Sequence, residues 1–120
     1  MAKETTTNSG SIYNALTQGS VITGNIISDN DFRIDGEVQG DMQCKGKVII
    51  GQTGLLKGKI ICANAEIIGT VIGDIQVTDT IILRSTANFT GEIKTRILVV
   101  EPNAVFNGTC SMKSVNDYTE

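Results

Sequence analysis

Hydrophobic and polar positions alternate along most of this chain, and one seven-residue pattern recurs within the alternation. A small residue opens the pattern, the third and seventh residues are apolar, and the fifth is glycine. The copies start 16, 18, 15, 18 and 17 residues apart, and a unit of about 17 residues repeated six times indicates a solenoid. The six copies are Ser20–Ile26, Gly36–Met42, Gly54–Ile60, Gly69–Ile75, Ala87–Ile93 and Ala104–Cys110.

Alignment of the copies collects the alternating positions into columns. Period-two alternation in runs this short, separated by Gly, Asp, Asn or Thr, is typical of half-buried strands. A second short strand between copies adds an inward pair of its own to each unit. The third positions are Ile22, Val38, Leu56, Val71, Phe89 and Phe106, the seventh are Ile26, Met42, Ile60, Ile75, Ile93 and Cys110, and the ninth are Ser28, Cys44, Cys62, Val77, Thr95 and Met112. The second-strand pairs are Phe32/Ile34, Val48/Ile50, Ala65/Ile67, Ile81/Leu83 and Leu98/Val100.

The corners between units account for much of the variation in repeat length. The corner is short at Asp35-Gly36 and Ile68-Gly69, and two residues longer in the other units. Pro102, the only proline, lies in a long corner, where its missing N–H and fixed φ do no harm. The small residue that opens each copy predicts a corner where two backbone segments approach closely.

A strand pair of this length cannot bury its apolar side alone. Stacking the units at the ~4.8 Å inter-strand spacing superposes equal positions into continuous columns. The predicted fold is therefore all-β, a single-domain parallel β-helix of about six coils, with Phe89 stacked on Phe106. An antiparallel sandwich is the alternative, but the one Asn-Gly hairpin signal, Asn107-Gly108, lies inside a repeat strand.

The pattern divides the chain into three segments. Residues 1–18 are expected to be a flexible polar tail, residues 19–112 the β-helix domain, and residues 113–120 a short polar tail. Within the first segment, Ser11–Leu16 contains Ile12, Tyr13 and Leu16, which could fold back over the first coil.

Composition narrows the function classes. The net charge of -3 offers no basic stripe for nucleic acid. Histidine is absent, which removes the commonest general base and metal ligand and disfavours an acyltransferase-like enzyme. Three cysteines without a signal-like N-terminus indicate free thiols in a reducing compartment, and no apolar run approaches the ~18 residues that span a bilayer. We expect a cytoplasmic protein that is not an enzyme and has no cofactor or metal.

Three local features are candidates for a phosphate loop, a disulfide and a cation site. Gly46-Lys47 and Gly58-Lys59 resemble the end of a phosphate loop, but an inward strand residue follows each lysine where such a loop needs Ser or Thr. Cys44 and Cys62 fall at one position in successive coils, within disulfide range, although buried free thiols are the favoured interpretation. An outward stripe could suggest a cation site, but it is better explained as a solvated face: Asp41, Lys59, Asp74 and Glu92.

Two surfaces are candidates for binding a partner or another copy of the chain. The first is a lateral face formed by the outward residues Ile49, Ile82 and Val99 of the second strands, which could pack against a partner or membrane. The second is the pair of open ends, since no convincing cap follows Met112. Covering ~6 side chains at the C-terminal end contributes ~6 kcal/mol, against ~4–15 kcal/mol for association, so end-to-end joining would depend on concentration. The predicted interface comprises Leu98, Val100, Phe106, Cys110 and Met112 at the C-terminal end and Ile22, Ile26, Phe32 and Ile34 at the N-terminal end.

Four runs within residues 19–112 stand out: Ile34–Asp41, Lys45–Gly51, Gly91–Thr95 and Ala104–Met112. In this order they together resemble the bactofilins. The resemblance implies a right-handed β-helix that polymerises spontaneously, end to end, into non-polar filaments, with Phe106 in the C-terminal joining coil. It also implies a bacterial cytoskeletal scaffold for cell shape or for placing cell-wall enzymes.

One segment departs from the family pattern. Many bactofilins carry a short N-terminal stretch with exposed apolar or aromatic residues that binds membrane. The first seven residues of this sequence, Met-Ala-Lys-Glu-Thr-Thr-Thr, do not resemble such a stretch. Membrane association at the inner face therefore stays open. The alternative function is a non-polymerising protein-binding module that uses the lateral face of Ile49, Ile82 and Val99.

Overall fold

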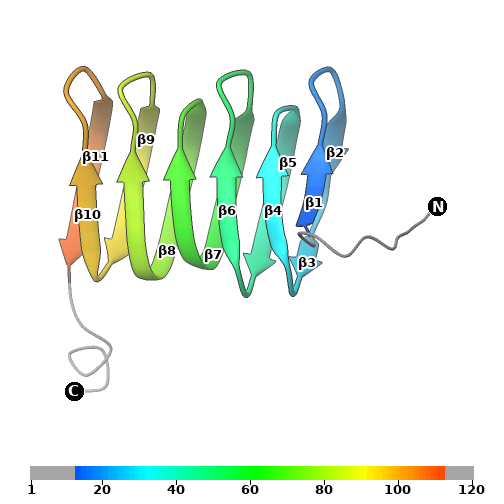
Figure 1. Ribbon diagram of the computed structural model, residues 1–120, viewed down its shortest axis with the longest axis horizontal. Coiled ribbons are helices and arrows are strands. Elements are labelled where there is room, and N and C mark those ends of the chain that lie inside the picture. Colours follow the sequence, from blue (N-terminus) through cyan, green and yellow to red (C-terminus); the bar gives the residue numbers. More distant parts are fainter. Residues whose placement is uncertain (1–12, 113–120) are drawn as a thin grey trace.

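The computed structural model describes residues 13–112, and these residues form one parallel β-solenoid (Figure 1). The eleven strands of this part of the chain belong to one sheet, and each pair of neighbouring strands is parallel and joins one coil to the next. The strands are β1 Tyr13–Leu16, β2 Val21–Thr23, β3 Ile26–Ser28, β4 Asp31–Ile34, β5 Glu37–Cys44, β6 Lys47–Ile50, β7 Leu55–Ile67, β8 Thr70–Leu83, β9 Asn88–Thr95, β10 Ile97–Val100 and β11 Val105–Met112.

The coils succeed one another along the long axis of the molecule, from β1 to β10 and β11 (Figure 1). The register is the one that the repeat predicts, since Phe89 pairs with Phe106 and Gly58 pairs with Gly40 and Gly73. The fold prediction of about six coils is thereby confirmed. Residues 13–112 consist of strands and turns, and none of them forms a helix that could cross a membrane.

The middle coils differ from the prediction in one respect. The two strands expected in each unit form one continuous strand in β7 and in β8, and each bends around the corner. A register shift between Cys62 and Asn64 absorbs the difference in repeat length at this corner.

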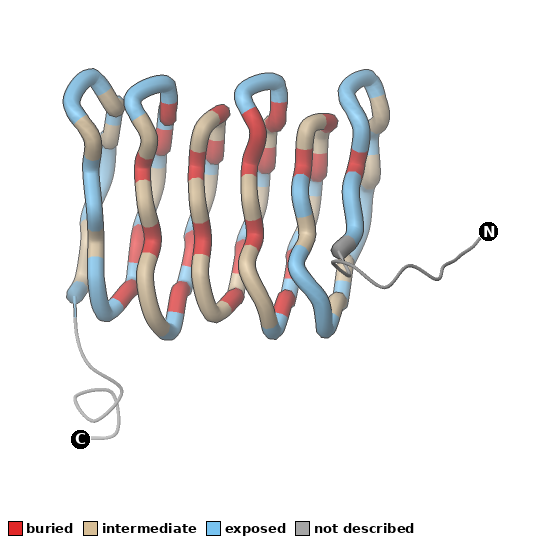
Figure 2. The backbone as a smooth tube through the Cα atoms, viewed as in Figure 1, coloured by how far each residue is buried: buried red, intermediate tan, exposed pale blue. Residues whose placement is uncertain are grey.

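The core is the set of columns that the alternation predicts. Their members in the middle coils are 0–2% exposed, apart from Cys44 at 5%. Figure 2 shows these buried residues concentrated in the middle coils, while the coils at the two ends are mostly exposed or half-buried. Close stacking of β-branched and aromatic side chains along the axis is the main source of stability in a solenoid of this kind.

A column of glycines lines one corner of every coil. These glycines have φ between +127° and +148°, a backbone conformation that other residues rarely adopt. A Cβ built on Gly58 would lie 1.9 Å from the carbonyl oxygen of Gly40 in the preceding coil. Close approach of the backbones therefore requires glycine as the fifth residue of the repeat. The column is Gly24, Gly40, Gly58, Gly73, Gly91 and Gly108.

The long corners are tight turns closed by a backbone hydrogen bond across four residues. Ala104 donates its N–H to the Glu101 carbonyl at 3.2 Å, and Ala87 donates to Arg84 at 2.9 Å. In the last of these corners Pro102 precedes Asn103, which has φ of 78°. Proline followed by a residue with positive φ is the preference of a type II turn.

The N-terminal boundary of the solenoid needs correction. Residues 13–16 lie inside the predicted tail of residues 1–18, yet they form β1 and pair with β4. Leu16 is 9% exposed and stacks on Ile34, so it belongs to the core. The four-residue spacing from Leu16 to Ser20 matches the long corners. The apolar pair expected at the inward positions of a second strand is incomplete here, because the first of the two positions holds Asn14. Ile12 lies outside the described residues.

Candidate assembly interface

The last coil, formed by β10 and β11, leaves an open sheet edge. At each interior step the residue after the corner donates its N–H to the opening residue of the preceding coil, as Val105 does to Ala87 at 2.9 Å. Ala104 holds the position of Ala87 one coil later, and no described residue lies beyond it. An edge with unpaired backbone groups can accept a further strand.

Apolar side chains occupy every inward position of this last coil. Val100 and Met112 are 46% and 54% exposed, although Leu83 in the coil before is 0% exposed. The Phe106 ring packs edge-on against Phe89 with centroids 5.6 Å apart, and no ring of residues 13–112 contacts its outer side. The predicted C-terminal interface residues therefore lie together on one open surface, which we call the C end: Leu98, Val100, Phe106, Cys110 and Met112.

The opposite surface, the N end, is partly polar. Ile22 and Ile26 lie half-buried in its inward positions, as expected. The other inward positions hold Asn14 and Ser28, and the Asn14 amide donates to the Ser28 hydroxyl at 2.9 Å. The hydroxyl in turn donates to the Asn30 carbonyl at 2.9 Å. These hydrogen bonds satisfy the polar groups that end the columns.

Two predicted residues of the N end are placed differently by β1. Ile34 is 0% exposed because Leu16 covers it, so its inclusion in the N-terminal interface is wrong. Phe32 is half-buried and pairs with Asn14, which stands between it and the end. Sequence reasoning missed Asn14 and β1 because a polar residue at an inward position looks like part of a tail.

Comparison with known proteins shows that this architecture belongs to a known family. Residues 14–111 match the family model of the bactofilins, which is described as polymer-forming and cytoskeletal. This chain belongs to the bactofilin family. The bactofilin resemblance drawn from the sequence is thereby confirmed, and the family is a structural cytoskeletal one.

Individual bactofilins show the same relation. The chain is 32% identical over 92 residues to BacO of Myxococcus xanthus, covering 77% of this chain and 73% of BacO. It is 25% identical over 114 residues to BacP of the same organism, covering 95% of this chain but 48% of BacP, so it spans about half the length of that relative. The structure of Thermus thermophilus bactofilin in double helical filaments matches with a TM-score of 0.80 and 30% identity, over 83% of this chain and 99% of that one.

The predicted lateral face of this bactofilin is only partly apolar. Ile49 and Ile82 are half-buried and Val99 is 42% exposed. Between the two isoleucines, Glu66 binds the Lys47 ammonium at 3.1 Å and the Arg84 guanidinium at 2.8 Å. The face therefore carries an ion-pair network across three coils, where an uninterrupted apolar patch would favour a partner.

The same network predicts a measurable acid sensitivity. Burial raises the pKa of Glu66, but hydrogen bonds from Arg84 and Lys47 outweigh it and hold the pKa below its ordinary value of 4.5. The stabilisation is therefore present above about pH 4.5 and is lost as the pH falls through the lowered pKa. Glu66→Gln should lower the free energy of unfolding by about 1 kcal/mol at pH 7 and by less at pH 3.

Denaturant unfolding of an assembly-deficient Phe106→Arg background at both pH values measures this difference. Glu92→Gln is the matched control, because Glu92 is exposed and makes no ion pair within the described residues. An equal loss for Glu66→Gln at pH 7 and pH 3 would contradict the assignment.

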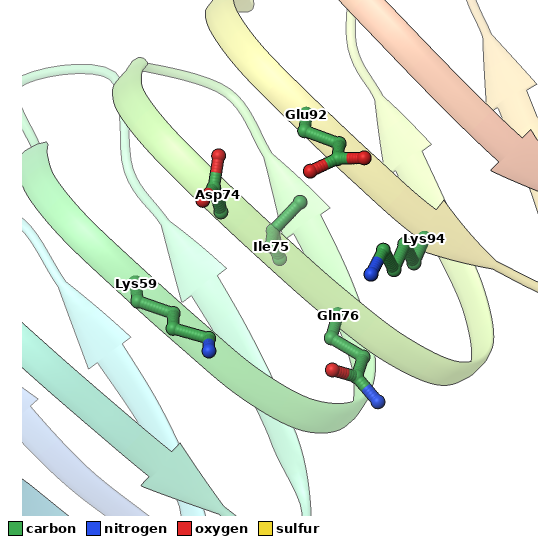
Figure 3. A pocket seen from close by; sticks show the side chains of 6 residues that line it. All are labelled: Lys59, Asp74, Ile75, Gln76, Glu92 and Lys94. Atoms are coloured by element: carbon green, nitrogen blue, oxygen red, sulfur yellow. The ribbon is translucent and has the colours of Figure 1, made fainter.

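The outward stripe lies on adjacent strands in the predicted register. Lys59 pairs with Asp41 and Asp74, and Asp74 pairs with Glu92. Figure 3 shows the depression around Asp74 and Glu92 with Lys59 and Lys94 beside it, so two cations accompany the two carboxylates. No group of three metal-ligating side chains occurs in residues 13–112. The stripe has the mixed charge of a solvated strand face.

The remaining candidates occupy structural positions. Lys47 begins β6 and Lys59 lies within β7, each followed by a fully buried residue, so the Gly-Lys pairs are parts of strands. Cys44 and Cys62 are buried free thiols, and burial raises the pKa of Cys62 to about 12. Cys110 is a free thiol in the half-buried part of the C end, where burial also raises its pKa.

Proposed function

We propose that this bactofilin assembles end to end into non-polar filaments without a nucleotide, and that the filaments act as a scaffold for cell shape or for placing cell-wall enzymes. The C end carries the proposal, because it combines an open strand edge with five unburied apolar side chains. Each interior coil covers the same columns completely, so a second copy can complete them in the same manner.

The physical chemistry of the C end supports association of this kind. Apolar area removed from water stabilises a contact by about 25 cal/mol per Å², and the pairing of edge backbone groups adds to this. The gain is comparable to the free energy that association costs, about 4–15 kcal/mol, so assembly depends on protein concentration. Neither Gly-Lys pair forms a phosphate loop, which supports assembly without a nucleotide.

The scaffold role follows from the same geometry. A rod whose six coils are built from one repeated unit offers its faces at regular intervals along a filament. The binding-module alternative has weaker support, because Ile49 and Ile82 are half-buried beside the Glu66 ion pairs.

Negative-stain electron microscopy of the purified chain without nucleotide tests the proposal. We expect long filaments for the unmodified chain and short particles for Phe106→Arg, since a charge in the apolar junction has no partner. Ile82→Arg is the matched control, because it places the same side chain on the lateral face one coil away from the end.

The control separates the two functions. Filaments of normal length in Ile82→Arg support end joining, whereas normal filaments in Phe106→Arg overturn it. Uniform small particles in the unmodified chain would also overturn polymerisation. Filament loss in Ile82→Arg alone would transfer the assembly surface to the lateral face.

A further inference from the structure

We infer that the filament is built in a fixed order, in which two C ends join first to give a stable dimer and the dimers then join through their N ends. This inference rests on the proposed function and assigns unequal strength to its two junctions. It follows from a difference between the two ends in the polarity of their inward side chains.

The inward positions of the two ends differ in polarity. All five at the C end are apolar, while two at the N end are the hydrogen-bonded Asn14 and Ser28. A head-to-tail junction would continue each column, because β1 shares the column of β10 and β3 shares that of β11. It would therefore place Leu98 against Asn14 and Met112 against Ser28.

Both head-to-tail contacts set an apolar side chain against a polar one. The Asn14 amide makes one side-chain hydrogen bond within the described residues, so covering it with Leu98 would remove its other donor and its acceptor from water without a partner, which is unfavourable. Joining two C ends sets apolar residues against apolar residues, and joining two N ends sets Asn14 and Ser28 near polar groups or bridging water. Like-end junctions therefore suit the side chains better, and the C-end junction buries more apolar surface.

Matched variants at the two ends of one column test the order. Ile22 and Phe106 occupy the first and last positions of the same column. Ile22→Glu blocks the N end, Phe106→Glu blocks the C end, and the double variant is the monomer reference. The same acidic substitution at both ends avoids an attraction between the blocked surfaces.

Sedimentation velocity at equal micromolar concentration supplies the readout. Ile22→Glu should be a dimer, whereas Phe106→Glu should be mostly monomeric, with a dimer dissociation constant at least about tenfold higher. A mixture of the two should contain no new heterodimer. Head-to-tail joining predicts the reverse, with two monomeric variants that form a heterodimer when mixed.

Thiol alkylation identifies the surface that the dimer uses. Cys110 lies in the C end, so the Ile22→Glu dimer should protect it relative to the double variant, as peptide mass spectrometry can show. Equal alkylation of Cys110 in both would overturn the inference. Buried Cys62 serves as an internal control for folding.

Dimers of equal stability in both single variants would overturn the fixed order. Absence of any filament in the unmodified chain would instead count against the proposed function.

Discussion

Gly58→Ala is expected to destabilise the solenoid severely, by about 3–5 kcal/mol, because it adds a methyl group where two backbones touch. The new Cβ would lie 1.9 Å from the Gly40 carbonyl oxygen, and that carbonyl cannot move without breaking the ladder of the preceding coil. The φ of +143° adds strain of its own. Because the free energy of unfolding of a domain is about 5–15 kcal/mol, a large fraction of the Gly58→Ala molecules should be unfolded or should fail to accumulate.

Gly24→Ala separates the two causes. Gly24 has a φ of +127°, but its Cβ would meet nothing within 4 Å, because it lies in the first coil of the described residues. It should therefore lose only the strain contribution, about 1–2 kcal/mol. Urea unfolding of both variants in the Phe106→Arg background gives the comparison. Equal losses would show that close backbone approach does not determine the glycine column.

Ile75→Ala is expected to be the second large effect, with a loss of about 2–5 kcal/mol. Ile75 is 1% exposed and lies between Ile60 and Ile93 in the neighbouring coils. The cavity would interrupt a column in the middle of the molecule, where neither end can relax to fill it. In a solenoid whose coils contact only their neighbours, the interruption should also broaden the unfolding transition.

Ile72→Ala is its control on the same strand. Ile72 lies three residues earlier in β8, faces outward and is 44% exposed, so the same substitution should lower stability by less than about 1 kcal/mol. The urea midpoints of the two variants, again in the Phe106→Arg background, measure the difference. A loss at Ile72 as large as that at Ile75 would mean that the inward and outward assignments of β8 are wrong.

The filament test measures assembly, whereas these two stability tests measure folding. Phe106 stacks on a fully buried Phe89 but has no coil above it, so a substitution there should affect assembly more than folding. Gly58 and Ile75 lie in the middle coils, and their substitution should affect folding first. A protein that keeps its stability and loses its filaments is the signature of an interface residue.

Much of the interface could be predicted, because equivalent positions in a repeat share one environment. The buried state of Phe89 shows what Phe106 would become if another coil covered it. Once the columns were aligned, the open positions at the C end followed directly. Ile34 was misplaced for the same reason, since the pattern that assigned it to the N end did not include β1.

The sequence by itself determined the fold class, the register and the residues of the columns, since period-two alternation and a glycine at the fifth position of each repeat are local properties. Only the tertiary structure decided which residues the N end leaves exposed. Coverage of Ile34 by Leu16, the Asn14–Ser28 hydrogen bond and the Glu66 ion pairs all join residues that are 14 or more positions apart. Contacts of that kind depend on how coils stack, and a repeat pattern that is the same in every coil cannot specify where the stack begins or ends.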